Sequence, residues 1–299
     1  MLQEWDDRRE KGGIMKRTCD EMLNLILEKA RNDERIRAVT MEGSLANENA
    51  VHDKYSDFDI CYYVRDIREF TADRSWVECF GEILIMQCPD DWYDHPYDYE
   101  GHENFAWLIQ FQDGNRIDLT LVDIRNIAGE TENRDPRIVL LNKDGFRELV
   151  PINSEEVFYI KKPDEKEYAL TCNEFRWVSI YITKGLCRQE IYYAKHAYDS
   201  PVMKMFMKML NWKIGTDHGF QVTTGSHGKY LKRFLTEEEM KRFHGIFPGG
   251  EYEDIWQKLF LMYDYFAENA EYVADKLGYF FDREETKRVR DFMMQRKNS

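Results

Sequence analysis

The sequence lacks several features that would assign it to a specialised class of protein. No apolar run in its 299 residues approaches the length needed to span a membrane. The first residues, MLQEWDDRREKGGIMKR, are charged and contain no apolar middle of the kind found in a signal peptide. The six cysteines form neither a C-x-x-C motif nor a Cys/His metal spacing, so we interpret them as small buried hydrophobic residues. We therefore expect a cytoplasmic protein that does not contact a membrane.

Positive charge is scarce in the first half of the chain. The net charge is −14, and residues 1–150 contain 19 Lys and Arg against 33 Asp and Glu, whereas residues 151–299 contain 23 of each. An acidic surface repels nucleic acid and attracts cations, so nucleic acid is not an expected partner. The excess of acidic residues in the first half either serves solubility alone or attracts a polycationic substrate.

The chain has no internal repeat, and its hydrophobic pattern changes once. An amphipathic segment, 18–31, precedes alternating runs that predict strands over 35–44, 57–64, 81–87, 105–112 and 116–122, the last two joined by a D-G turn. Beyond the linker around Pro151 and Pro163, helical spacing covers 165–184, 188–199, 201–212, 236–246, 251–278 and 282–296. These patterns predict an α+β protein, with an α/β domain over 1–155 and a helical bundle over 156–299.

Two aspartates alternate in the stretch YSDFDICYYV. Residues two apart in a strand share a face, so Asp57 and Asp59 lie together while Phe58 and Ile60 face the core. Two carboxylates on one face repel each other unless a cation neutralises them, and a hard cation such as Mg²⁺ prefers oxygen ligands. Asp118 lies on the polar face of RIDLTLV and joins the same pocket if the two strands are neighbours.

Gly43 and Ser44 end the strand that precedes these aspartates. Glycine lets the backbone approach a ligand closely, and backbone N–H groups together with a serine hydroxyl can hold phosphate oxygens. Neither G-S nor D-x-D alone is specific. Their succession on consecutive strands, with a later strand aspartate, is typical of a nucleotidyltransferase and predicts a metal–nucleotide site.

Beyond this motif, the sequence resembles the aminoglycoside 6-adenylyltransferases, also called streptomycin adenylyltransferases. The matching stretches are DERIRAVTMEGSLANEN, YSDFDICYYV, GEILIMQ, QFQDGNRIDLTLV, CNEFRWVSIYITKGLCRQEIYYAKHAYD and MKMLNWKIG. The first of them are shared with the wider nucleotidyltransferase superfamily, whereas the block that begins CNEFRWVS is specific to the narrower family. The resemblance implies a nucleotidyltransferase-type mixed-sheet domain followed by a helical substrate-binding domain.

The resemblance also implies transfer of AMP from ATP to a hydroxyl group of streptomycin, with release of pyrophosphate and a role in antibiotic resistance. Asp57 and Asp59 would hold Mg²⁺ ions that bridge the phosphates and balance charge during an in-line displacement. Asp118 would either complete the metal site or take the proton from the attacking hydroxyl, while Gly43 and Ser44 would contact the nucleotide. The expected partners are ATP and a cationic aminoglycoside, bound by a monomer or weak dimer.

The sequence departs from the family pattern at two places. The family usually reads G-S-R, whereas Leu45 follows Ser44 here; if that arginine touches phosphate, its loss weakens nucleotide binding. The prefix 1–14 precedes the usual family start near Met15, and is either a disordered extension or a misplaced start. Two other functions stay open: a nucleotidyltransferase with another hydroxylated acceptor, and a nucleotide-binding relative without activity. The presence of Asp57, Asp59 and Asp118 argues against a relative without activity.

The first long helical segment carries an aromatic stripe. Glu174, Trp177 and Tyr181 are spaced to share one face. The aromatic residues alone favour core packing, but a buried carboxylate needs a partner, so the alternative is a wall of the antibiotic pocket. There Glu174 would meet a guanidinium or amine and Trp177 would stack on it. In the next helix, Lys195 is either half of a surface pair with Asp199 or, under the resemblance, a ligand of the triphosphate.

Overall fold

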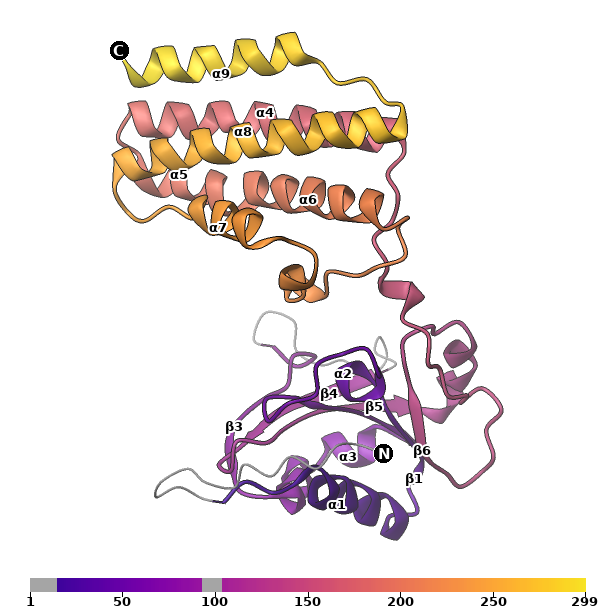
Figure 1. The fold of residues 1–299 in the computed structure, drawn as a ribbon. Helices are drawn as coiled ribbons and strands as arrows, with labels where there is room; N and C mark the ends of the chain where they lie inside the picture. The colour runs from indigo at the N-terminus through magenta and orange to yellow at the C-terminus, as the bar shows by residue number, and fades with distance from the viewer. Residues whose placement is uncertain (1–14, 93–103) are drawn as a thin grey trace. The chain divides into compact units, whose positions relative to one another are not determined.

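A computed structural model describes residues 15–92 and 104–299 (Figure 1). The prefix 1–14, and with it the expected extension, lies outside the described residues. The chain divides into two compact units, Met1–Val157 and Phe158–Ser299. Among the described helices, none combines the length and the apolar character that crossing a membrane requires.

The described part of the first unit is built around a mixed six-stranded sheet with the order β3-β4-β5-β2-β1-β6. The strands are β1 Ile36–Met41, β2 Phe58–Val64, β3 Ile83–Gln87, β4 Asn104–Phe111, β5 Arg116–Asp123 and β6 Ile138–Asn142. Strands β2 and β5 pair in parallel, and the other neighbours are antiparallel. The five predicted strands are confirmed. Strand β6 was missed, because IVLLN is a short apolar run without alternation.

One face of this sheet carries the main core of the first unit. Helix α1 (Cys19–Asn32) begins at a capping box formed by Thr18 and Glu21, and buries Met22 and Ile26 against the strands. The segment 67–80, which contains the short helix α3 (Arg68–Thr71), adds aromatic residues to the same core. The opposite face is polar where β2 and β5 begin, and it carries the candidate site.

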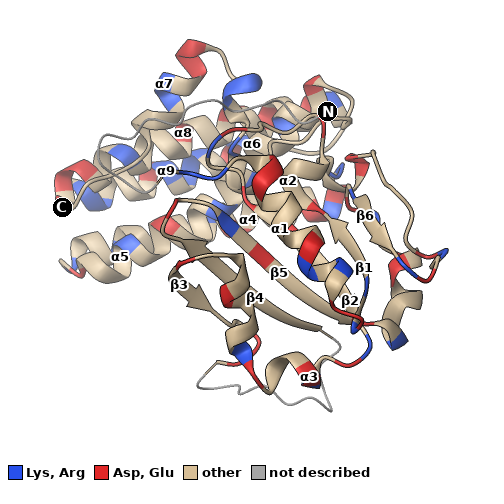
Figure 2. Cartoon of the chain, turned by 90° about the horizontal axis from the view of Figure 1, so that it is seen from below, with Lys and Arg blue, Asp and Glu red and all other residues tan. Residues whose placement is uncertain are grey.

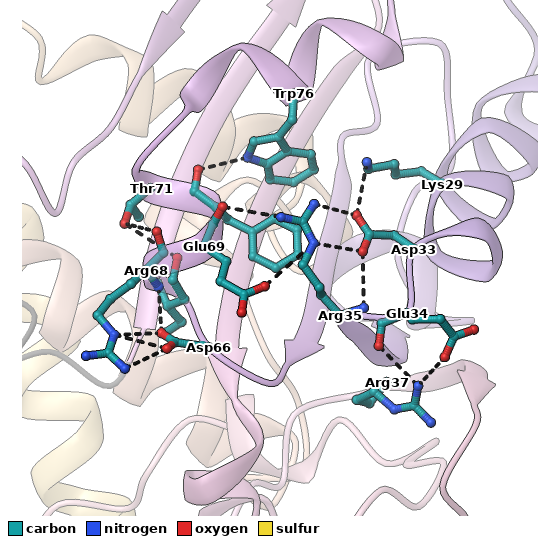
Figure 3. Close-up of polar contacts among 12 residues, drawn as sticks. Lys29, Asp33, Glu34, Arg35, Arg37, Asp66, Arg68, Glu69, Thr71 and Trp76 are labelled. Carbon is teal, nitrogen blue, oxygen red and sulfur yellow. Dashed lines mark hydrogen bonds and ion pairs between the residues drawn. The ribbon is translucent and has the colours of Figure 1, made fainter.

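A network of charged side chains fixes the entry of the chain into β1 (Figure 3). Arg35 donates hydrogen bonds to the two carboxylate oxygens of Asp33 at 2.9 and 2.7 Å, and its guanidinium lies 4.2 Å from the ring centroid of Phe70. Lys29 adds an ion pair of 3.2 Å to Asp33. The hydrogen bonds from Arg35 hold the pKa of Asp33 well below its usual range. This end of β1 is therefore pinned, and the polar site lies beyond the other end, at Met41.

The second unit is helical throughout its described elements, apart from short turns. It contains α4 Glu165–Cys187, α5 Ile191–Ala197, α6 Met203–Asp217, α7 Glu237–Gly245, α8 Tyr252–Leu277 and α9 Arg283–Lys297. The six predicted helices are confirmed, with ends shifted by a few residues. The unit has its own core, in which Phe175 of α4 stacks on Phe266 of α8 with ring centroids 3.7 Å apart.

Helix α7 shows how charge and helix direction agree in this unit (Figure 2). Its first turn carries Glu237, Glu238 and Glu239, and its last turn carries Arg242. Acidic residues at a helix N-terminus and a basic residue at the C-terminus both complement the helix dipole. Thr236 and Glu239 add a capping box. The start of α7 is therefore well defined without burying any of its residues fully.

Candidate active site

Asp59 on β2 and Asp118 on β5 are register partners across the parallel strand pair. Neighbouring strands lie about 4.8 Å apart, so these two side chains project as neighbours from one face of the sheet. Asp57 lies one residue before β2, and its carboxyl group interacts electrostatically with that of Asp118. Strand 116–122 lies beside strand 57–64, so the condition under which Asp118 joins Asp57 and Asp59 is met. Two strands therefore bring three carboxylates to the same polar face.

Gly43 lies directly against Asp59. Its φ of +65° is in the left-handed region, and a Cβ added at this position would lie 1.9 Å from Oδ2 of Asp59. The next residue back, Glu42, donates its N–H to the carbonyl oxygen of Asp59 at 2.9 Å. Gly43 begins the short helix α2 (Gly43–Ala46). Only glycine allows the G-S turn to approach the Asp59 carboxylate this closely.

The turn after Ser44 is held by a histidine. Nε2 of His52 lies 2.9 Å from the carbonyl oxygen of Ser44 and 3.0 Å from that of Asn47. The same imidazole thus contacts one carbonyl group within α2 and one at its C-cap, and Ser44 is only half-buried. The predicted phosphate contacts, Gly43 and Ser44, therefore stand beside the aspartates, with a fixed backbone.

Arg116 is a residue of this site to which the sequence prediction gave no role. Its Nε and Nη2 donate to the two oxygens of Asp118 at 2.7 and 2.8 Å, and Nη1 lies 3.8 Å from Oδ2 of Asp57. Burial raises the pKa of Asp57, the charge of Asp118 adds to this effect, and Arg116 opposes it. The guanidinium therefore offsets part of the repulsion. The signal was the alternation in RIDLTLV, which places Arg116 and Asp118 on one face.

The donor chemistry of the three aspartates fits a hard divalent cation, because carboxylate oxygens are the ligands that Mg²⁺ prefers. Within residues 15–92 and 104–299, however, no three His, Cys, Asp or Glu side chains are already gathered closely enough to hold a metal ion. Both oxygens of Asp118 are engaged by Arg116 instead. The Arg116 guanidinium thus supplies the positive charge next to Asp118. Asp118 must give up its ion pair with Arg116 to bind a metal.

Glu42 adds a carboxyl group that the sequence analysis also missed. Burial raises the pKa of Glu42 to about 7, the charge of Glu130 contributes, and Arg137 opposes both. Arg137 is fully buried and forms an ion pair with Glu130. Near neutral pH, Glu42 is therefore only partly ionised, and it adds less negative charge to the Asp59 side of the sheet than the sequence suggests.

Leu45 belongs to the core of the first unit. Its side chain is 4% exposed and is part of the main core cluster. This leucine therefore does not face a ligand. The hypothesis that position 45 acts directly on phosphate does not apply to the side chain that is present.

Glu174 and Trp177 are exposed on α4 in the second unit, whereas Tyr181 on the same helix is half-buried and packs against the core. Trp177 is 55% exposed, and its Nε1 donates to the hydroxyl of Tyr181 at 2.7 Å. The two rings meet edge to face, with centroids 6.1 Å apart. Glu174 is exposed on the same helix. The core-packing interpretation is therefore wrong for Trp177 but holds for Tyr181, which packs partly buried against the core, so the exposed part of the stripe is Glu174 and Trp177.

Lys195 on α5 is engaged by two acceptors. Its Nζ donates to Oδ1 of Asp199 at 2.9 Å and to the carbonyl oxygen of Pro248 at 3.2 Å. The surface pair with Asp199 is thus present. A role for Lys195 at the triphosphate stays a prediction, and it requires these contacts to be exchanged for phosphate oxygens.

Known proteins resemble this chain over most of its length. A family model described as streptomycin adenylyltransferase matches residues 16–296. An aminoglycoside 6-adenylyltransferase of Bacillus subtilis is 35% identical over 264 residues, which are 88% of this chain and 92% of the relative. One of Staphylococcus aureus is 32% identical over 253 residues, 84% of this chain and 88% of the relative. A crystal structure of an aminoglycoside 6-adenyltransferase from Bacillus subtilis, at 31% identity and a TM-score of 0.47, covers 95% of this chain and 100% of that chain.

Proposed function

The chain belongs to the streptomycin adenylyltransferase family, and we propose that it transfers AMP from ATP to a hydroxyl group of an aminoglycoside and releases pyrophosphate. Streptomycin is the acceptor that we propose, with resistance to the antibiotic as the result. The observation that carries the proposal is the pairing of Asp59 with Asp118 on adjacent parallel strands, with Gly43 against Asp59. This closeness supports a site in which the turn at Gly43 and Ser44 would contact phosphate beside the acidic groups.

Mg²⁺ is the cation that we propose for this site, held by Asp57, Asp59 and Asp118. Such an ion would neutralise the phosphates and stabilise charge on the attacking and leaving oxygens. The protein itself also offers groups that can bind the phosphates. Gly43 and Ser44 offer backbone N–H groups and a hydroxyl to phosphate oxygens, and Arg116, once released from Asp118, can pair with a phosphate. Asp118 either completes the metal site or accepts the proton of the attacking hydroxyl.

The acceptor-binding side of the proposal uses α4. Streptomycin carries guanidinium groups and an amine, so it arrives as a polycation. An exposed tryptophan face attracts such a cation, and a neighbouring carboxylate can pair with it. Trp177 and Glu174 offer this combination on one exposed helix face, and the half-buried Tyr181 adjoins Trp177.

The test is release of pyrophosphate from Mg-ATP by the full-length chain across a panel of aminoglycosides. We expect release with streptomycin and none after chelation of the metal. If pyrophosphate were released only with a different hydroxylated acceptor, the proposed acceptor would be wrong and the proposed reaction would stand. Binding of ATP without release for any acceptor would favour the relative without activity, and would overturn the proposal. Asp59→Asn serves as the negative control.

A further inference from the structure

Two adjoining pockets lie in the second unit, where α6, the segment 223–228 and α7 meet. The larger has a volume of about 650 Å³, and its apolar lining consists of Met203, Met207, Phe243 and Phe247. The smaller has a volume of about 290 Å³ and is lined in part by Lys161, Thr223 and Thr224. Both are lined by Lys208, Asn211 and Gly225, so they form one double pocket with an apolar part and a polar part.

The double pocket carries uncompensated positive charge. Its two carboxylates are already paired, Glu167 with Lys208 at 2.7 Å and Asp199 with Lys195 at 2.9 Å. Lys161 and Lys204 form no ion pair with any described residue. Residues 200–235 contain six basic residues and one acidic residue, in a chain of net charge −14. Such a pocket attracts anions and repels an aminoglycoside.

Three residues that line the larger pocket share an unusual backbone conformation. Gly225, His227 and Gly228 all have positive φ, of 71°, 52° and 79°. Glycine adopts this region freely, and histidine is among the other residues that adopt it more readily than most. Thr224 donates to Oδ1 of Asn211 at 3.0 Å, which orients the Asn211 amide. The amide nitrogen of Asn211 then has no partner among the described residues, and it is a donor that suits an anion.

We infer that the double pocket binds a nucleoside phosphate. The phosphates lie near Lys161 and Lys204, and the heterocycle packs against Phe243 and Phe247. Lysine binds phosphate as a point charge, and aromatic side chains stack on heterocycles. The larger pocket has the volume of a typical small-molecule site. The inference goes beyond the proposed transfer reaction and does not depend on the three aspartates.

Calorimetry tests whether the pocket binds the phosphates. It measures the binding of ATP and of inorganic tripolyphosphate to the full chain in the presence of a chelator. Lys204→Glu should weaken both ligands by about tenfold or more, because a charge-assisted contact becomes repulsive. Lys287→Glu on α9 is the matched control, since Lys287 is also an exposed lysine without a described ion pair and lines neither pocket. We expect it to bind like the wild type.

Phe247→Ala tests the nucleoside part. Phe247 is 51% exposed, so its removal leaves the fold intact. ATP should bind about fivefold or more weakly, by loss of one stacked ring, while tripolyphosphate binding stays unchanged. Three results would each overturn the inference. The wild type could fail to bind ATP without metal, Lys204→Glu could bind ATP as tightly as the wild type, or Phe247→Ala could leave the affinity for ATP unchanged. A chain that shows the expected binding yet adenylates nothing would refute the proposed function alone.

Discussion

The two units differ in charge and in how they hold the side chains of the candidate site. Residues 1–157 contain 19 basic and 35 acidic residues, a net charge of −16, whereas residues 158–299 contain 23 and 21, a net charge of +2. In the first unit, Asp59 and Asp118 are fixed by strand register and by a glycine contact. In the second, Trp177 and Glu174 stand on an exposed helix face.

This difference suggests a division of roles. A metal-dependent displacement tolerates little error in the position of its carboxylates, and a sheet ladder fixes such positions well. Recognition of a large polycation tolerates more variation, and exposed aromatic and acidic side chains are adequate for it. We therefore expect variants of the first unit to lower kcat, and variants of α4 to raise the KM for the aminoglycoside.

The largest effect is expected for Asp59→Asn. It removes one of the three carboxylate charges that we propose for the metal site, and we expect kcat to fall by about 10³-fold or more, because transition-state charge loses its stabilisation. Asp66→Asn, beyond the other end of β2, is the matched control and should leave kcat unchanged. Turnover near the wild-type level in Asp59→Asn, with a normal circular dichroism spectrum, would refute the metal-site assignment.

The second prediction concerns Leu45→Arg, which restores the residue found in the family pattern. Because Leu45 is 4% exposed in the core, we expect the arginine to destabilise the first unit by about 3 kcal/mol, as an unpaired charge is buried. Denaturant unfolding measures this loss. A variant as stable as the wild type, with a lower KM for ATP, would show that position 45 can turn toward the nucleotide.

Leu45 also illustrates what the sequence alone could and could not predict. Alternation in DFDICYYV and RIDLTLV was enough to place Asp57, Asp59 and Asp118 on polar faces, because a strand has a period of two. The direction of a side chain in the four-residue helix α2 follows no such period, so the burial of Leu45 was not predictable. The pairing of Arg116 with Asp118 depends on rotamers, and these depend on neighbours that the sequence does not specify locally.

The same distinction applies to the second unit. Helical spacing placed Glu174, Trp177 and Tyr181 on one face, but spacing does not say whether that face meets the core or solvent. Packing of α4 against other helices decides this point. The structure answers it for Trp177, which is 55% exposed.

The third prediction compares two glycines of the first unit. Gly43 and Gly114 both have left-handed φ, of 65° and 83°, but a Cβ would meet Asp59 at Gly43 and nothing within 4 Å at Gly114. Gly114→Ala should cost about 1 kcal/mol of stability and keep its activity. Gly43→Ala should in addition displace the Asp59 carboxylate and lower kcat by about 10²-fold. Equal activity in the two variants would show that the close contact with Asp59 has no catalytic importance.

The smallest effect is expected for Glu174→Gln, which keeps the shape of the side chain and removes its charge. If Glu174 pairs with a guanidinium of streptomycin, the KM for streptomycin should rise by about fivefold, with kcat and the KM for ATP unchanged, because an exposed ion pair contributes about 1 kcal/mol or less. The rise should shrink as salt is added, since salt screens exposed charges. Glu284→Gln on α9, also exposed, is the matched control.

Other outcomes of the Glu174→Gln experiment would change the division of roles. A collapse of kcat with little change in KM would make Glu174 the base that accepts the hydroxyl proton, and would extend the chemistry to the helical unit. Wild-type values for both constants would make Glu174 a structural residue. The acceptor would then have to be placed against some surface other than this face of α4, and Trp177→Ala would decide whether any part of the stripe contacts it.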